Sequence, residues 1–153
     1  MKVVVLAAGK GVRMVPITET RPKHMIPIGG KPMLENVLMS IVASGLRDIR
    51  LVVGYRKELV KRYFGDGEKL GAKIRYIEQH DVSGTASAIG AAERFVDDRE
   101  FVSVYGDLCV TGEAIKRVVS AERDRGENTM AVVPVQDPSI YGIVSISGRR
   151  VTG

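Results

Sequence analysis

Residues 6–31 combine glycines with basic side chains and directly follow an apolar run at residues 3–5. Between Lys10 and Lys31, five Lys or Arg residues accompany a single acid, Glu19, so this stretch carries a net charge of four against five for the whole chain. Backbone amides and fixed positive charge at the end of a strand are suited to binding a polyphosphate. A solvated loop with surface lysines is the alternative, but charge, glycine content and position all favour a phosphate loop.

The loop does not match two common nucleotide-binding motifs. The string G-x-x-x-x-G-K-[ST] of the P-loop is absent from the sequence. The dinucleotide motif G-x-G-x-x-G is incomplete, because Gly9 and Gly11 supply two of its three glycines and Met14 stands in the place of the third. Pro16 follows closely and disfavours immediate entry into a helix. The sequence therefore argues against a nicotinamide oxidoreductase.

The elements that must position this loop alternate between strands and helices. Apolar patterning predicts helices at residues 32–44, 57–64, 85–96 and 113–125, and strands at residues 2–7, 49–53, 73–78, 101–105 and 130–135. Strands joined through helices imply right-handed crossovers, so we expect an α/β, Rossmann-like three-layer sandwich with a mostly parallel sheet and helices on both faces. Ligands of such sheets bind outside the carboxyl ends of the strands. That rule selects the loops at residues 8–27, 54–56, 79–84, 106–110 and 136–142.

Length and composition limit the classes of protein to consider. A chain of 153 residues predicts one domain, and residues 142–153 read as a hairpin whose second strand has barely begun. Despite the net positive charge, basic and acidic side chains alternate outside the first loop, so we expect no nucleic-acid partner. No apolar run has the length of a membrane span. The single cysteine, Cys109, fits a cytoplasmic protein, and we expect it to be a small buried residue.

The opening of the chain resembles that of the sugar-phosphate nucleotidylyltransferases. The pattern reads LAAGKGVRM at residues 6–14, followed by Pro16, Thr18, Arg21-Pro22-Lys23, Pro27 and Lys31-Pro32-Met33-Leu34. Further along, Gln79 with Gly84-Thr85-Ala86, Gly106-Asp107 and Tyr141-Gly142 are similar to later segments of the family. The resemblance implies a reaction in which a nucleoside triphosphate and a sugar 1-phosphate give a nucleotide-sugar and pyrophosphate.

The resemblance also implies roles for residues of the first loop. Arg13 and Lys23 match the catalytic cations, which would hold the leaving pyrophosphate and the attacking phosphate. His24 and Lys10 are weaker candidates, and His24 is more simply an ordinary loop residue. The small residues of the loop let backbone amides approach a nucleotide. The implied nucleotide-binding set is Leu6, Ala7, Ala8, Gly9, Gly11, Gln79, Gly84 and Thr85.

The remaining roles fall on residues at later strand ends. Asp107 matches the family's metal-binding aspartate, and Mg²⁺ is usually held by one or two carboxylates plus substrate oxygens; a helix cap is the alternative role for this side chain. The amide of Gln79 carries a donor and an acceptor, which suits the edge of a pyrimidine. Gln79 together with Gly84-Thr85-Ala86 looks most like the uridylyl and thymidylyl branches of the family, so the resemblance implies UTP or dTTP as the donor, with a guanylyl or cytidylyl donor as the alternative. Tyr141 and Gly142 match the turn that contacts the sugar.

Two expectations of the resemblance find no counterpart in this chain. Family members use a second acid and a Glu-Lys-Pro motif, both beyond the position of Gly153. We therefore expect residues 1–153 to be a nucleotidyltransferase domain that is incomplete at its C-terminus. The main alternative to an enzyme is a truncated nucleotide-binding module with little or no turnover. Many relatives assemble through C-terminal repeats, so a homo-oligomer remains open.

Overall fold

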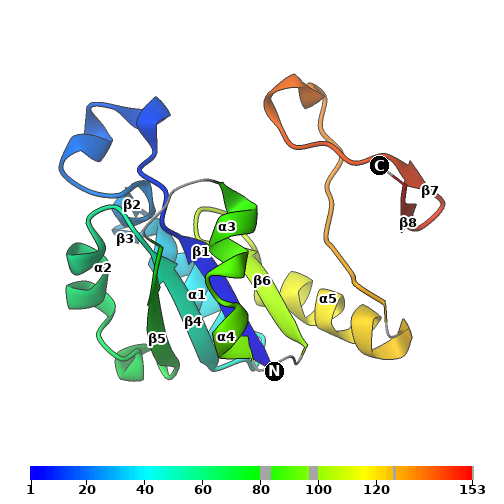
Figure 1. Ribbon diagram of the computed structural model, residues 1–153, viewed down its shortest axis with the longest axis horizontal. Helices are drawn as coiled ribbons and strands as arrows, with labels where there is room; N and C mark the ends of the chain where they lie inside the picture. Colours follow the sequence, from blue (N-terminus) through cyan, green and yellow to red (C-terminus); the bar gives the residue numbers. More distant parts are fainter. Residues whose placement is uncertain (80–83, 97–99, 126, 153) are drawn as a thin grey trace.

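The computed structural model describes residues 1–79, 84–96, 100–125 and 127–152. Four strands, β1 (Lys2–Ala7), β4 (Asp48–Val53), β5 (Lys73–Glu78) and β6 (Phe101–Tyr105), form a parallel sheet in the order β5-β4-β1-β6 (Figure 1). The register pairs Val3 of the central β1 with Ile49 on one side and with Val102 on the other. The expected parallel α/β architecture is confirmed.

Side chains of β1 alternate between two apolar layers, which explains its continuous apolar run. Val3 and Val5 pack with α1 (Met33–Ala43), α2 (Lys57–Phe64) and α5 (Gly112–Arg125) on one face of the sheet. Val4 and Leu6 pack on the other face, where α3 (Thr85–Gly90) and α4 (Glu93–Val96) lie in front of the strands in Figure 1. Helices therefore cover both faces, as the three-layer prediction required.

The first crossover is less regular than the others. Three short 3-10 helices, η1 (Val12–Met14), η2 (Ile17–Glu19) and η3 (Lys23–Met25), lead into a small antiparallel pair, β2 (Pro27–Ile28) and β3 (Lys31–Pro32). Pro32 caps α1 instead of beginning it. A further 3-10 helix, η4 (Glu68–Leu70), joins α2 to β5. The long first connection thus forms a separate loop above the sheet, which Figure 1 shows in blue.

Three sequence predictions need correction. The helix expected over residues 85–96 is two short helices, because α3 ends at Gly90, a poor helix former. The strand expected over residues 130–135 is wrong: the segment leaves α5 without lying against a strand edge, and Val133 is 77% exposed (Figure 1). Cys109 is exposed, because it lies in the loop after β6 and not in the strand.

The C-terminal residues form a short η5 (Pro138–Ile140) and a hairpin of β7 (Ile146–Ser147) with β8 (Arg150–Val151). The hairpin is antiparallel, with Ile146 opposite Val151, so the predicted turn at this place is confirmed with a shorter first strand. None of the helices in the described ranges has the length and apolar character that crossing a membrane requires.

Candidate active site

The loops that follow the four strands meet at one edge of the sheet, because the strands are parallel. Backbone hydrogen bonds join them there. The Gly106 N–H donates to the Leu6 carbonyl at 2.9 Å, and the Tyr55 N–H donates to the Ala8 carbonyl at 3.1 Å. The Gln79 N–H continues the β4–β5 ladder. The structure therefore brings the loop after β1, Gln79 and the Gly106 turn to a common edge, as expected from the sequence.

A buried threonine fixes the shape of the phosphate loop. Thr18 is fully buried in η2, and its hydroxyl donates to the Gly11 carbonyl at 2.9 Å. Gly11 has φ +76°, a left-handed conformation that favours glycine, and a Cβ there would lie 2.8 Å from the Cβ of Lys23. Glycine at position 11 thus lets the loop fold back against the stem of Lys23.

Lys23 and Asp107 form an ion pair across this edge of the sheet. The ammonium of Lys23 on η3 donates to the carboxylate of Asp107 directly after β6. Their side chains keep 30% and 28% of their surface exposed, so both remain reachable from solvent. A cation and a carboxylate that are 84 positions apart in sequence therefore share one accessible place at the strand ends.

His24 lies beneath this pair and is nearly fully buried. It is 2% exposed, and its Nδ1 has no hydrogen-bond partner in the described part of the chain. Its ring packs under Gly106, where a Cβ would come within 3.2 Å of its Cδ2. Burial, and secondarily the charge of Lys23, lowers the pKa of His24 to about 4, although Asp107 acts in the opposite direction. His24 is therefore a neutral packing residue at neutral pH.

Glu78 anchors the end of β5 beside Gln79. Both Lys57 and Lys61 of α2 donate to its carboxylate. These hydrogen bonds, that of Lys57 first, lower the pKa of Glu78 to about 2. The pair of lysines thus holds the strand end from which Gln79 projects.

Gln79 is 8% exposed, and its Nε2 donates to the hydroxyl of Ser87 at 3.2 Å. Ser87 belongs to α3, for which Gly84 is the N-cap and Thr85 the first residue. The structure therefore places the expected base-binding residues at one strand-to-helix junction. Most of the loop between them, residues 80–83, lies outside the described residues.

Not every predicted site residue comes to this edge. Arg13 lies on η1 in the same loop as Lys23 and is exposed. Tyr141 and Gly142 lie in the C-terminal segment, where Tyr141 is 58% exposed and the chain runs apart from the sheet (Figure 1). The structure does not bring these two residues to the strand ends, and their sugar-binding role stays a prediction.

Gly54 allows the close approach of the β4–α2 turn to the phosphate loop. A Cβ at Gly54 would lie 2.9 Å from the Ala8 carbonyl oxygen. We expect Gly54→Ala to lower the free energy of unfolding by about 1–3 kcal/mol, because backbone must move to admit the methyl group. Gly90→Ala is the matched control, since no atom of the described residues beyond its chain neighbours and its own helix backbone lies within 4 Å of a Cβ there. Urea unfolding measures both, and an equally stable Gly54→Ala would contradict the tight approach.

The side chains at this edge can be compared with the ligands that a metal ion requires. Within the described ranges, no three His, Cys, Asp or Glu side chains come together as a metal site. Asp107 offers one accessible carboxylate beside the cation Lys23. Since Mg²⁺ commonly uses one or two protein carboxylates and completes its shell with water and phosphate oxygens, Asp107 fits a substrate-borne magnesium ion and not a metal cage built from protein alone.

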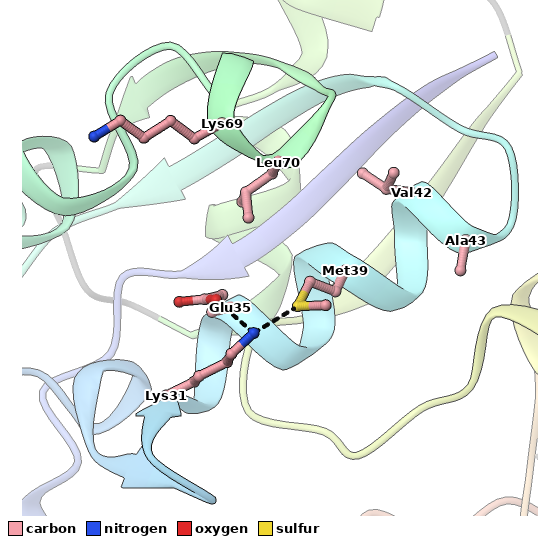
Figure 2. Close-up of a pocket in the computed structure, with 7 residues that line it drawn as sticks. All are labelled: Lys31, Glu35, Met39, Val42, Ala43, Lys69 and Leu70. Carbon is pink, nitrogen blue, oxygen red and sulfur yellow. Dashed lines mark hydrogen bonds and ion pairs between the residues drawn. The ribbon is translucent and has the colours of Figure 1, made fainter.

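A groove along α1 is lined by residues of that helix and of η4, together with Lys31 (Figure 2). Met39, Val42 and Leu70 give it an apolar floor, and Lys31 pairs with Glu35 at 3.3 Å at one side. The Lys23–Asp107 pair, unlike this groove, lies at the carboxyl ends of the parallel strands, where sheets of this kind bind their ligands, and we place the site there.

Comparison with known proteins decides the family. The model of the family described as nucleotidyl transferase matches residues 2–153. The chain belongs to this family. It is 38% identical to a glucose-1-phosphate thymidylyltransferase of Streptomyces antibioticus, over all of this chain and 44% of the relative. It is 37% identical to the bifunctional protein GlmU of Methanococcus maripaludis strain C5, over 95% of this chain and 33% of the relative.

The solved structures agree with the family and the fold. A crystal structure from Bacillus anthracis, provisionally named a glucose-1-phosphate thymidylyltransferase and solved in complex with a sucrose, superposes with a TM-score of 0.87 at 28% identity. The match covers 99% of this chain and 62% of that one. The chain thus spans less than half the length of the two curated relatives named above.

Proposed function

We propose that this chain carries the nucleotide-binding and catalytic loops of a sugar-1-phosphate nucleotidylyltransferase that uses UTP or dTTP. The observation that carries the proposal is the Lys23–Asp107 pair at the strand ends, in a chain of the nucleotidyl transferase family. A pyrimidine nucleotide is supported by the name of the similar thymidylyltransferase and by the amide of Gln79.

The reaction joins the sugar 1-phosphate to the α-phosphate of the nucleotide and releases pyrophosphate. A phosphate oxygen of the sugar 1-phosphate forms a bond to the α-phosphorus, and the bond from that phosphorus to the β-phosphate oxygen breaks in line. Pyrophosphate leaves with the electron pair. Positioning and neutralisation of charge supply most of the rate in such transfers.

The chain offers a residue for each of these demands. Arg13 and Lys23 would neutralise the charge of the phosphates, and Gly9 and Gly11 would let backbone amides approach them. Asp107 would hold a magnesium ion, which when bound screens the negative charge of the triphosphate. Lys23 would then leave Asp107 and bind a phosphate oxygen. Before the substrate binds, the ion pair would hold both side chains at the site.

A nucleotide-binding module without turnover is the second candidate. It is favoured by the single carboxylate, that of Asp107, paired with Lys23 at this edge among the described residues. Such a module would bind the triphosphate through the same loop and would release no pyrophosphate.

One experiment separates the two candidates. The chain is incubated with Mg²⁺, UTP or dTTP and a panel of sugar 1-phosphates, pyrophosphate release is followed, and triphosphate binding is measured by calorimetry. We expect binding together with release that depends on the sugar phosphate. Binding without release would favour the module, and the absence of both would show that the proposal is wrong.

A further inference from the structure

The turn after β4 reaches across the sheet edge and holds the phosphate loop. The Tyr55 hydroxyl donates to the Glu19 carbonyl at 3.0 Å, and Nη2 of Arg56 donates to the same carbonyl at 2.7 Å. Nε of Arg56 also donates to the Tyr55 hydroxyl at 3.0 Å. Together with the Tyr55 N–H on Ala8, these bonds join the turn to the start of the loop and to its middle. We call Tyr55 and Arg56 the loop clamp.

Arg56 makes these contacts from an unfavourable backbone conformation. It has φ 49° and ψ 38°, and it is the single residue other than glycine with a positive φ in the described ranges. A left-handed conformation costs a residue with a side chain about 1–2 kcal/mol. Glycine would avoid this cost at a helix N-cap, but it would also lose the guanidinium. The surroundings therefore hold Arg56 in a strained geometry in which both of its hydrogen bonds can form.

The clamp acts on the part of the loop that carries the cations. Glu19 lies between Arg13 on η1 and Lys23 on η3. The ammonium of Lys10 lies 5.4 Å from the centre of the Tyr55 ring, a cation–π distance. A clamp at Glu19 thus limits the movement of the segment in which Arg13 must meet the phosphates.

We propose that Tyr55 and Arg56 are positioning residues that hold the phosphate loop in its triphosphate-binding shape before the nucleotide arrives. The inference rests on the proposed function. A loop ordered in advance loses less conformational entropy on binding, so the clamp strengthens binding without touching the ligand. Its effect should fall on the β- and γ-phosphates, which Arg13 and Lys23 would help to hold under the proposed function, and not on the base.

Calorimetry with Mg²⁺ and two ligands tests the clamp: the triphosphate (UTP or dTTP) and the matching monophosphate. We expect Arg56→Ala to weaken triphosphate binding about three- to tenfold, which is the effect of losing one or two hydrogen bonds. Monophosphate binding should change less than twofold. Tyr55→Phe keeps the ring beside Lys10 and removes only the hydroxyl, so a smaller loss with the same selectivity is expected. Arg56→Lys retains one donor and should restore part of the affinity.

Arg47→Ala is the matched control. Nη1 of Arg47 donates to the Gly71 carbonyl at 2.8 Å, an arginine–carbonyl bond near the start of β4, at the end of the strand away from the site. It should leave the affinities for both nucleotides within twofold of wild type. Unchanged triphosphate binding in Arg56→Ala and Tyr55→Phe, or an equal loss for both ligands, would overturn the clamp alone. A wild-type chain that binds no triphosphate would overturn the proposed function and the clamp with it.

Discussion

Under the proposed function, Asp107→Asn is expected to lower pyrophosphate release about a hundred- to a thousandfold, the range seen when one charge-stabilising group is removed from an active site. Asparagine keeps the size of the side chain but removes the charge that Lys23 pairs with. The same change removes the one carboxylate that we assign to magnesium. Both losses act on the phosphates that take part in the transfer. We therefore expect a large loss of turnover and little loss of stability.

The fold should survive this substitution. The Lys23–Asp107 pair is about one-third exposed, and pairs of this kind contribute about 0–1 kcal/mol to stability. Circular dichroism and urea unfolding should therefore give values close to those of the wild-type protein. Loss of folded signal in Asp107→Asn would assign the residue a structural role instead.

Two further variants isolate the chemistry of the pair. Lys23→Met should also lower turnover but leave the dependence on Mg²⁺ concentration unchanged, whereas Asp107→Asn should shift that dependence to higher concentrations. Glu113→Gln makes the same change of charge in an exposed pair with Arg117 on α5 and should stay within twofold of wild type. Turnover of Asp107→Asn near that of wild type would remove the metal assignment.

Much of this site could be predicted because its parts are short, local signals. The strands over residues 73–78 and 101–105 and the helix over residues 57–64 have the bounds that the sequence predicted. Parallel strands place their carboxyl ends at one edge, so Lys23, Gln79 and Asp107 could be assigned to the same region from their positions after the strands.

The rest depends on contacts that no local pattern reveals. Arg56 follows a strand and precedes a helix, and its bond to Glu19 joins residues 37 positions apart. His24 lies in a charged loop, which suggests exposure, and it is buried because Gly106 has no side chain to exclude it. The apolar run at residues 130–135 reads as a strand, yet the structure gives it no strand edge to join. In each case the outcome depends on which segment becomes a neighbour after folding.

Acid is expected to destabilise the protein through His24, in a pH range set by its lowered pKa. The folded-state pKa is about 4, against an ordinary value of 6.5 in the unfolded chain. Well above pH 6.5 neither state holds the proton, and the full stability is present. As the pH falls from 6.5 towards 4, the His24 ring binds a proton in the unfolded state but stays neutral in the folded state, so the free energy of unfolding decreases. The loss approaches 1.4 kcal/mol per pH unit and about 3 kcal/mol in total.

Urea unfolding between pH 4.5 and 7 measures this effect apart from the carboxylates. Glu78, whose pKa is lowered to about 2, loses its stabilising charge only as the pH falls from about 4.5 towards 2. His24→Leu removes the titrating ring and should flatten the slope between pH 6.5 and 4.5, whatever its stability at pH 7. An unchanged slope in His24→Leu would show that the buried ring beneath the Lys23–Asp107 pair does not cause the acid sensitivity.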